Sequence, residues 1–324
     1  METRELGRSG ISVSRVILGC GNFGGVGSAP EFFGQGIPKR EAFRIMDRAW
    51  ELGVTTFDTA DAYGGGRSET FIGDWLKTKD GSVRDAITIE TKTFNPNEAG
   101  ADHGLARVRI LRQIDVSLGR LGLDRVALYL AHDCDPDVPQ EETLRAFDEL
   151  VRVGKVGAVG ASNFDTRQLT EALEVSRREA ITRYEWVQNS FSLLDREDAE
   201  TVHPVCRENG LGYEAFGPLA GGWLTGKYRR GAAYPEGSRM TQRPQHYERY
   251  EKDRVYDALE AFEHEAFGRG VSMAGLAIAW LISEPEVTAV VVGPTRAEHL
   301  EPVLEAVALE LTSAERTHLR GLFA

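Results

Sequence analysis

Short runs of apolar and β-branched residues recur along the chain at intervals too long for hairpins. Each run is almost continuously apolar, which is typical of strands buried on both faces of a parallel sheet. The runs span residues 15–19, 54–57, 86–90, 126–130, 156–160, 184–187, 211–215 and 288–292. The pattern therefore predicts a series of eight buried parallel strands.

Between these runs, apolar residues recur at helical spacing. In one stretch Leu144, Phe147 and Leu150 fall on a single face of a predicted helix. Helices are predicted over residues 39–52, 67–76, 105–118, 141–153, 166–177 and 197–208. A glycine at the end of a helix supplies the left-handed residue that closes it. The glycines that mark predicted helix ends are Gly53, Gly119 and Gly210.

Strand and helix alternate through the whole sequence, which predicts an α/β protein with one domain over residues 1–324, a (β/α)8 TIM barrel. An open doubly wound sheet is the second interpretation, because such sheets rarely need so many units. Residues 3–13 predict a β-hairpin that caps the barrel floor. Residues 217–250 predict a long loop over the active face, and residues 312–322 predict an extra C-terminal helix.

The composition limits which kinds of partner the protein can bind and indicates its cellular compartment. The formal net charge is -12, and this acidic balance argues against a nucleic-acid or anionic-membrane partner. Cys20, Cys134 and Cys206 are sparse and odd in number, so a reducing compartment is expected and no role is predicted for them. The sequence shows neither a long apolar span nor a secretory signal at its start, so we expect a cytoplasmic protein. The oligomeric state is left open.

The segment Gly19-Cys-Gly21-Asn-Phe-Gly24 matches the glycine pattern of dinucleotide-binding turns and follows a predicted strand. That pattern requires a helix to open at once, so that its N-terminus meets the pyrophosphate. The residues that follow, up to Pro30, cannot start a helix, and the next helix begins at about Pro38, a good first-turn residue. We therefore predict a glycine-rich loop near the active face instead of a pyrophosphate turn.

Polar residues stand at the C-terminal ends of consecutive predicted strands, where TIM-barrel active sites lie. Asp58 ends the second strand and Tyr63 follows it, Lys92 ends the third, and His132 ends the fourth. Alone, each residue is better explained as a helix cap, a packed side chain or a solvated charge. Together they predict a group of side chains that share one mouth of the barrel.

These four residue types can together donate a proton to a substrate. A phenol has a pKa of about 10, and a nearby ammonium held by a carboxylate favours its ionised form. A histidine can donate a hydrogen bond that orients a substrate oxygen. The set predicts reduction of a carbonyl group, with hydride arriving on carbon while Tyr63 protonates oxygen.

The motifs around these residues resemble those of the aldo-keto reductase family. The matching segments are residues 57–64 (FDTADAYG), 155–164 (KVGAVGASNF) and 216–228 (FGPLAGGWLTGKY). The resemblance runs nearly the full length of the chain. It implies a TIM barrel, reversible NADPH-dependent reduction of an aldehyde or ketone to an alcohol, and a catalytic tetrad of Asp58, Tyr63, Lys92 and His132.

The resemblance also implies a site for NADPH (NADP+) without a Rossmann fold. Ser162, Asn163 and Gln188 match positions that bind the nicotinamide carboxamide, and Phe216 matches an aromatic ring that stacks on the nicotinamide. Arg296 matches the loop that holds the adenosine 2'-phosphate. The other expected cofactor-binding residues are Gly21, Gly217, Pro218, Leu219, Gly221, Gly293, Thr295 and His299. Gly217 stands where the family usually has Ser, and His299 where Gln or Asn is common.

Two other functions remain open. One is a regulatory subunit that binds NADPH with little turnover, like the potassium-channel β-subunits of the same family. The other is a metal-dependent barrel hydrolase using His132, Asp133 and Asp135, which is disfavoured because such sites usually need several histidine ligands. We therefore predict no metal site, and we expect a small-molecule carbonyl or alcohol as the partner.

Aromatic residues of the long loops predict an apolar substrate cleft; they are Phe23, Phe32, Phe33, Phe94, Trp223 and Tyr228.

Overall fold

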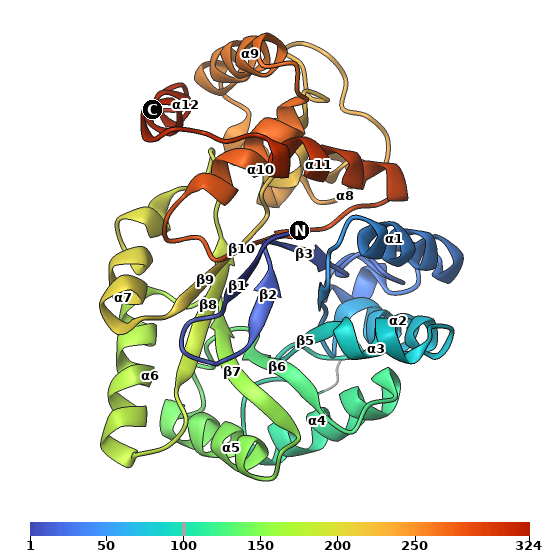
Figure 1. Cartoon of the computed structure of the whole chain (residues 1–324), viewed down its shortest axis with the longest axis vertical. Helices are drawn as coiled ribbons and strands as arrows, with labels where there is room; N and C mark the ends of the chain where they lie inside the picture. The colour runs from blue at the N-terminus through green and yellow to red at the C-terminus, as the bar shows by residue number, and fades with distance from the viewer. Residues whose placement is uncertain (99–101) are drawn as a thin grey trace.

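The computed structural model describes residues 1–98 and 102–324. Eight parallel strands follow one another around a closed barrel, and the last strand pairs with both the first and the seventh (Figure 1). They are β3 (Val16–Gly19), β4 (Thr56–Asp58), β5 (Thr88–Thr93), β6 (Val126–Ala131), β7 (Val156–Ser162), β8 (Tyr184–Ser190), β9 (Gly212–Phe216) and β10 (Ala289–Val292). The predicted strands and the TIM barrel are confirmed.

Helices surround the barrel, as Figure 1 shows. The predicted ones are confirmed as α1 (Lys39–Glu51), α2 (Arg67–Lys77), α4 (Arg107–Leu121), α5 (Gln140–Arg152), α6 (Thr166–Glu179) and α7 (Val202–Asn209). The remaining helices are α3 (Gly81–Ala86), α8 (Arg239–Gln242), α9 (Asp253–Gly268), α10 (Met273–Ser283), α11 (Glu301–Ala308) and α12 (Ser313–Gly321). The last of these confirms the predicted C-terminal helix.

Several predicted boundaries are wrong. The helix predicted from residue 197 begins only at Val202, after a separate 3-10 turn, η3 (Glu197–Ala199). Gly119 lies inside α4, which ends instead at Gly122 with a left-handed φ of 69°. The extra turn buries Leu121 against the core, and burial outweighs the weak helix propensity of one glycine. Ala86 was assigned to a strand but ends α3, because the Asp80 side chain caps that short helix by accepting from the backbone N–H of Val83.

Apolar side chains form two separate cores. The larger one lies between the strands and the surrounding helices. The smaller one fills the inside of the barrel, and Leu6 and Val13 of the N-terminal segment pack there against Trp186 and Leu128. The strands β1 (Thr3–Glu5) and β2 (Ser12–Ser14) pair antiparallel across the barrel in Figure 1. The predicted hairpin that closes the barrel floor is therefore confirmed.

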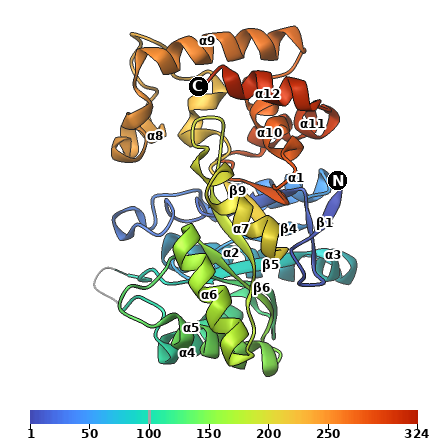
Figure 2. The ribbon, with the colours of Figure 1, turned by 90° about the vertical axis from the view of Figure 1, so that its left-hand side faces the viewer.

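The long connections gather at the other end of the barrel. Figure 2 shows α8 and the loop after β3 on the side opposite the N-terminal hairpin. The predicted loop over residues 217–250 is broken by short helical turns: η4 (Ala220–Thr225), α8, η5 (Pro244–His246) and η6 (Glu248–Tyr250). In a TIM barrel, this C-terminal end of the strands carries the active site.

Among the described residues, no single helix is both long and apolar enough to cross a membrane. Only α9 and α10 taken together reach that length and hydropathy, and these two helices are bent by 89° relative to each other.

Candidate active site

The structure brings the four predicted tetrad residues together at the mouth of the barrel. Lys92 is fully buried, and its ammonium donates to the Asp58 carboxylate and, over 3.1 Å, to the carbonyl oxygen of Thr59. The Lys92 Nζ atom lies 5.3 Å from the centre of the Tyr63 ring. The Tyr63 hydroxyl lies 3.4 Å from Nε2 of His132. The arrangement places one phenol and one imidazole above a buried ion pair.

A tight glycine turn presents Tyr63 to this mouth. Gly64 has a left-handed φ of 59°, and a Cβ atom there would lie 2.6 Å from the carbonyl oxygen of Phe23. A Cβ atom on Gly25 would lie 2.5 Å from the Cα of Gly64. Gly21, predicted to bind cofactor, lies beside the Tyr63 ring, since its Cβ would be 3.5 Å from Cε2. The glycines of the first loop therefore allow two backbone segments to touch at the catalytic turn.

The glycine pattern over residues 19–24 does not lead into a helix. No helix opens there, because α1 begins only at Lys39, with Pro38 as its N-cap residue and not in its first turn. The predicted loop near the active face is confirmed, while the predicted place of Pro38 is off by one position. Gly24 has a left-handed φ of 69°, and a Cβ atom there would lie 2.5 Å from the Arg67 side chain, so backbone conformation and space explain this glycine.

Burial and the Lys92 ammonium act in opposite directions on the pKa of the Tyr63 phenol. Burial raises the pKa of Tyr63 to about 12, although the Lys92 ammonium lowers it. Burial lowers the pKa of Lys92, but Asp58, Tyr63 and Glu90 together raise it further, so the lysine is charged. Burial, and next to it Lys92, holds the pKa of His132 well below its usual range. The site thus combines a neutral imidazole, an un-ionised phenol and a cation.

A layer of buried polar side chains lies below the tetrad and was not predicted from the sequence. The Gln188 amide nitrogen lies 3.2 Å from Asp58 Oδ1, 3.3 Å from Glu90 Oε1 and 3.0 Å from Glu214 Oε2. Trp186 also donates to Glu90, over 3.2 Å. Burial raises the pKa of Glu214 to about 7 and that of Glu90 well above its usual range. Both glutamates therefore keep their protons to a higher pH than exposed carboxyl groups do.

The residues expected to hold the nicotinamide end β7, β8 and β9, which are neighbouring strands. Ser162 pairs in register with Gln188, which pairs in register with Glu214. Asn163 has a left-handed φ of 60°, and its amide donates over 2.9 Å to the carbonyl oxygen of His132. The Gln188 amide hydrogens face the carboxylates, so its oxygen is left as an acceptor for a ligand.

The sequence model of the Aldo/keto reductase family matches residues 15–322, a range that includes the barrel strands and the tetrad. The chain belongs to the aldo/keto reductase family. This membership supports oxidoreductase chemistry in general.

Three relatives illustrate the range of this aldo/keto reductase family. The chain is 35% identical over 332 residues to an uncharacterized oxidoreductase of Bacillus subtilis (strain 168), covering 100% of this chain and 96% of the relative. It is 33% identical over 324 residues to an L-glyceraldehyde 3-phosphate reductase of Escherichia coli (strain K12), with coverages of 95% and 88%. It is 32% identical over 315 residues to a probable voltage-gated potassium channel subunit beta of Arabidopsis thaliana, with coverages of 95% and 91%.

In this aldo/keto reductase, the two loops expected to hold the cofactor phosphates leave the barrel side by side, because β9 and β10 are hydrogen-bonded neighbours. Arg296 is the N-cap residue of a 3-10 helix, η7 (Ala297–Leu300), which leads into α11. The loop that carries Arg296 therefore runs directly into a 3-10 turn. Thr295 Oγ1 lies 3.0 Å from His299 Nδ1. The first loop carries Gly217, Pro218, Leu219 and Gly221, and the second carries Gly293, Thr295, Arg296 and His299.

Two further cations beside these loops were missed in the sequence. Burial, and then Arg239, lowers the pKa of Lys227. Burial, and after it Arg296 and Lys227, lowers the pKa of His299. Arg239 donates over 2.6 Å to the Asn22 amide oxygen. Within the described residues, none of Lys227, Arg239 and Arg296 forms an ion pair. Uncompensated cations in a chain of net charge -12 fit a multiply charged anion.

The aromatic cleft expected from the loops is only partly correct. Phe23 and Trp223 are fully buried and Tyr228 is 2% exposed, and all three belong to the outer core. They cannot line a substrate cleft in this structure. Phe32, Phe33 and Phe94 are half-buried on the loops at the mouth and remain available. Beside His132 lies a polar group, the Asn95 amide, whose nitrogen is 3.2 Å from Nδ1.

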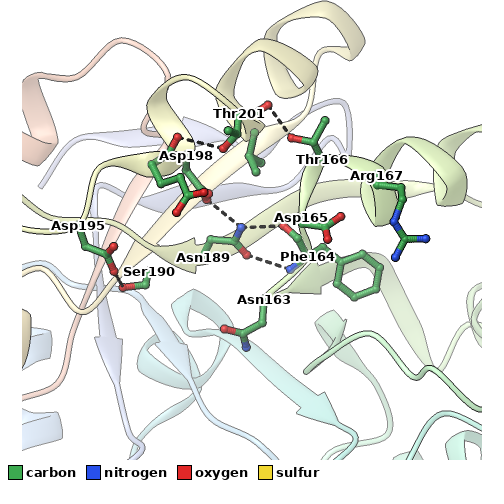
Figure 3. Close-up of a pocket in the computed structure, with 12 residues that line it drawn as sticks. Asn163, Phe164, Asp165, Thr166, Arg167, Asn189, Ser190, Asp195, Asp198 and Thr201 are labelled. Atoms are coloured by element: carbon green, nitrogen blue, oxygen red, sulfur yellow. Dashed lines mark hydrogen bonds between the residues drawn. The ribbon is translucent and has the colours of Figure 1, made fainter. Parts of the chain in front are cut away.

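A separate cavity of about 550 Å³ opens beside the ends of β7 and β8. Figure 3 shows Asn189 bridging Phe164 and Asp198, and Ser190 bonded to Asp195. Its other lining residues are Asn163, Asp165, Thr166, Arg167, Glu197, Thr201 and Val202. It shares only Asn163 with the predicted cofactor residues and contains none of the tetrad. Its carboxylates would repel phosphate, so we do not assign it to the cofactor.

The metal-site alternative has no geometric support in the described part of the chain, where no cluster of three or more His, Cys, Asp or Glu could hold a metal ion. The carboxylates it would use are bonded to backbone instead. Asp133 accepts from the N–H of Cys134 over 2.8 Å, and Asp135 accepts from that of Leu105 over 2.6 Å. These contacts shape the loops around His132.

Proposed function

We propose that this protein reduces an aldehyde or ketone to an alcohol with NADPH, reversibly, with Tyr63 as the proton donor. The observation that carries the proposal is the pair of donors at the mouth, the Tyr63 hydroxyl and His132 Nε2, 3.4 Å apart above the buried Lys92–Asp58 ion pair. A carbonyl oxygen that meets both groups is polarised and positioned for protonation.

Residues of the chain itself donate the proton and stabilise the anion that is left behind. Tyr63 gives its hydroxyl proton to the substrate oxygen as that oxygen gains negative charge, and the nearby Lys92 ammonium stabilises the phenolate left behind. Asp58 holds the ammonium in place. Bound NADPH supplies the hydride that reaches the carbonyl carbon. Hydride and proton together convert C=O to CH–OH, and Tyr63 then regains a proton from solvent.

The residues present fit a nicotinamide dinucleotide. The Gln188 amide oxygen and the Ser162 hydroxyl suit a carboxamide, which has both donors and an acceptor. Phe216 is half-exposed at the end of β9 and offers a ring face. Lys227, Arg239 and Arg296 suit the phosphates, and Arg296 supports the 2'-phosphate and hence NADPH over NADH. A cytoplasmic location remains part of this proposal.

The cofactor preference is tested by Arg296→Ala. We expect the Kd for NADPH to rise about tenfold while that for NADH stays unchanged, because only NADPH carries the phosphate that the guanidinium meets. Fluorescence titration with each nucleotide measures both values. An equal loss for the two nucleotides would contradict a 2'-phosphate contact.

The reaction itself is tested by NADPH consumption with a panel of aldehydes and ketones. The panel includes L-glyceraldehyde 3-phosphate, because a relative of 33% identity is named as its reductase. Turnover with formation of the alcohol supports the proposal. Tight NADPH binding without turnover would instead favour a regulatory subunit. This alternative is supported by a relative that is named as a potassium channel subunit. No binding of either nucleotide would overturn both.

A further inference from the structure

The second ring nitrogen of His132 has a partner of its own. The amide nitrogen of Asn95 lies 3.2 Å from Nδ1 of His132. An amide nitrogen has hydrogens but no free lone pair, so it can only donate. Nδ1 must therefore accept, and a neutral imidazole then carries its single hydrogen on Nε2. This is the nitrogen that faces the Tyr63 hydroxyl.

Asn95 is itself held by a buried cation. The Arg109 guanidinium donates to the Asn95 carbonyl oxygen over 2.7 Å and to Thr93 Oγ1 over 2.7 Å. It also donates to the Gly104 carbonyl oxygen over 3.1 Å. Arg109 is 2% exposed, and three acceptors leave it little freedom to move. The backbone that carries Asn95 is thus fixed independently of the Asn95 side chain.

The network continues to the second aspartate of the segment FDTADAYG. Asp61 is fully buried and lies 3.5 Å from Arg109. Asp61 also accepts from Thr93 over 2.8 Å and from Gln113 over 3.1 Å. Burial raises the pKa of Asp61 to about 7, although Arg109 opposes this shift. The motif that supplies Tyr63 therefore also anchors the loop that contacts His132.

We propose that Asn95 is a positioning residue that holds neutral His132 in its Nε2–H form, so that the imidazole donates to the substrate oxygen beside Tyr63. The inference rests on the proposed carbonyl reduction. In the opposite tautomer, Nε2 would be an acceptor 3.4 Å from the phenol and would compete with the substrate for the Tyr63 proton. The Asn95 contact removes that competition and gives the substrate oxygen two donors.

The tautomer is read directly from two-bond proton–nitrogen NMR spectra of protein labelled with 15N-histidine, with His132→Asn to assign the signals. Wild-type protein is expected to show a neutral His132 with the hydrogen on Nε2. In Asn95→Asp the new carboxylate accepts from Nδ1, so the hydrogen moves to Nδ1 or the ring becomes charged. A wild-type ring with its hydrogen on Nδ1 overturns the inference, whether or not the protein turns over any carbonyl.

Kinetics supply the second readout. We expect Asn95→Asp to lower kcat about 100-fold, the loss typical for one oriented donor, with NADPH affinity unchanged. Asn95→Leu removes the donor without imposing the wrong tautomer, so its loss is smaller, about tenfold. Asn97→Asp adds the same charge to the same loop. Among the described residues Asn97 forms no hydrogen bond with His132, so the kcat of this control variant is expected to stay near wild type.

The outcomes separate this inference from the proposed function. If wild-type protein reduces no carbonyl, the function fails, while the NMR spectra still decide the tautomer. If wild-type protein turns over and Asn95→Asp keeps its kcat and its Nε2–H signal, the positioning role of Asn95 is wrong. Thermal unfolding of each variant is the control for folding. We expect each variant to stay folded, because Arg109 contacts the backbone of Asn95 and not its side chain.

Discussion

At the scale of single residues, the site depends on charges kept away from water. Burial raises the pKa of Tyr63, the Lys92 ammonium opposes it, and the carboxylates Asp58 and Glu90 add to the rise. The Glu90–Glu214 pair lies below Asp58, and Gln188 connects all three. Removing one glutamate should therefore change how the protein responds to pH.

Glu214→Gln is expected to flatten the pH dependence of stability. The pKa of Glu214 is raised from 4.5 to about 7, so the folded protein binds this proton more tightly than the unfolded chain. The resulting stabilisation is complete below pH 4.5 and is lost as the pH rises through about 7. Relative to the variant, the wild-type free energy of unfolding should fall by about 3 kcal/mol across that window.

Urea unfolding of both proteins at several pH values measures this difference. Asp61, whose pKa is also raised, is present in both proteins and cancels in the comparison. Parallel stability curves would show that Glu214 does not titrate in this range.

The sequence was a good guide to the residues that lie at the mouth and a poor one to those beneath it. Asp58, Lys92 and His132 could be predicted because strand ends converge in a barrel. Glu90 and Glu214 sit inside apolar runs, and such runs report burial without showing which polar atoms meet inside. Lys227 and Arg239 were missed because their loop has no periodic pattern to place them.

At the scale of elements, the turn after β4 controls where the Tyr63 hydroxyl lies. That turn combines a left-handed Gly64 with direct backbone contact to the first loop. A side chain at this position meets both backbone strain and a steric clash, whereas one at Gly10 meets only backbone strain.

Gly64→Ala separates these two effects when compared with Gly10→Ala. Gly10 has a φ of 71° with nothing within 4 Å of its missing Cβ, so its variant should lose about 1 kcal/mol of stability. Gly64→Ala should lose about 3 kcal/mol, because the Cβ also displaces the Phe23 carbonyl. It should also lower kcat, since Tyr63 moves. Equal losses of stability and unchanged kcat in both variants would show that the close approach is unimportant.

Element boundaries were harder to predict than the elements themselves. Gly122 instead of Gly119 closes α4, because one more buried leucine favours another turn. Short pieces such as α3 and η7 have too few residues for a periodic apolar face, so their local caps decide them.

At the scale of the whole molecule, the two ends of the barrel have different tasks. The hairpin plugs the floor with apolar side chains, and the polar tetrad occupies the mouth (Figure 2). In such a barrel, changes at the floor affect stability and changes at the mouth affect activity. The closed barrel could be predicted because every strand–helix unit repeats the same pattern, so local errors at the ends do not alter the topology.

Leu6→Ala tests this division. Leu6 is fully buried inside the barrel, so its truncation should cost about 3 kcal/mol of unfolding free energy. The kcat of the folded variant should stay within about twofold of wild type. Leu304→Ala, at a position 44% exposed, is the matched control and should cost less than about 0.5 kcal/mol. A large loss of kcat in Leu6→Ala would mean that floor and mouth are coupled.

The central claim is that Tyr63 protonates a carbonyl oxygen during NADPH-dependent reduction, and Tyr63→Phe tests it most directly. The ring is kept and only the transferable proton is removed. With the best substrate of the panel, we predict that kcat falls at least about 100-fold while fluorescence titration gives an unchanged Kd for NADPH. A Tyr63→Phe enzyme that reduces the same substrate at the wild-type rate would contradict this account of the site.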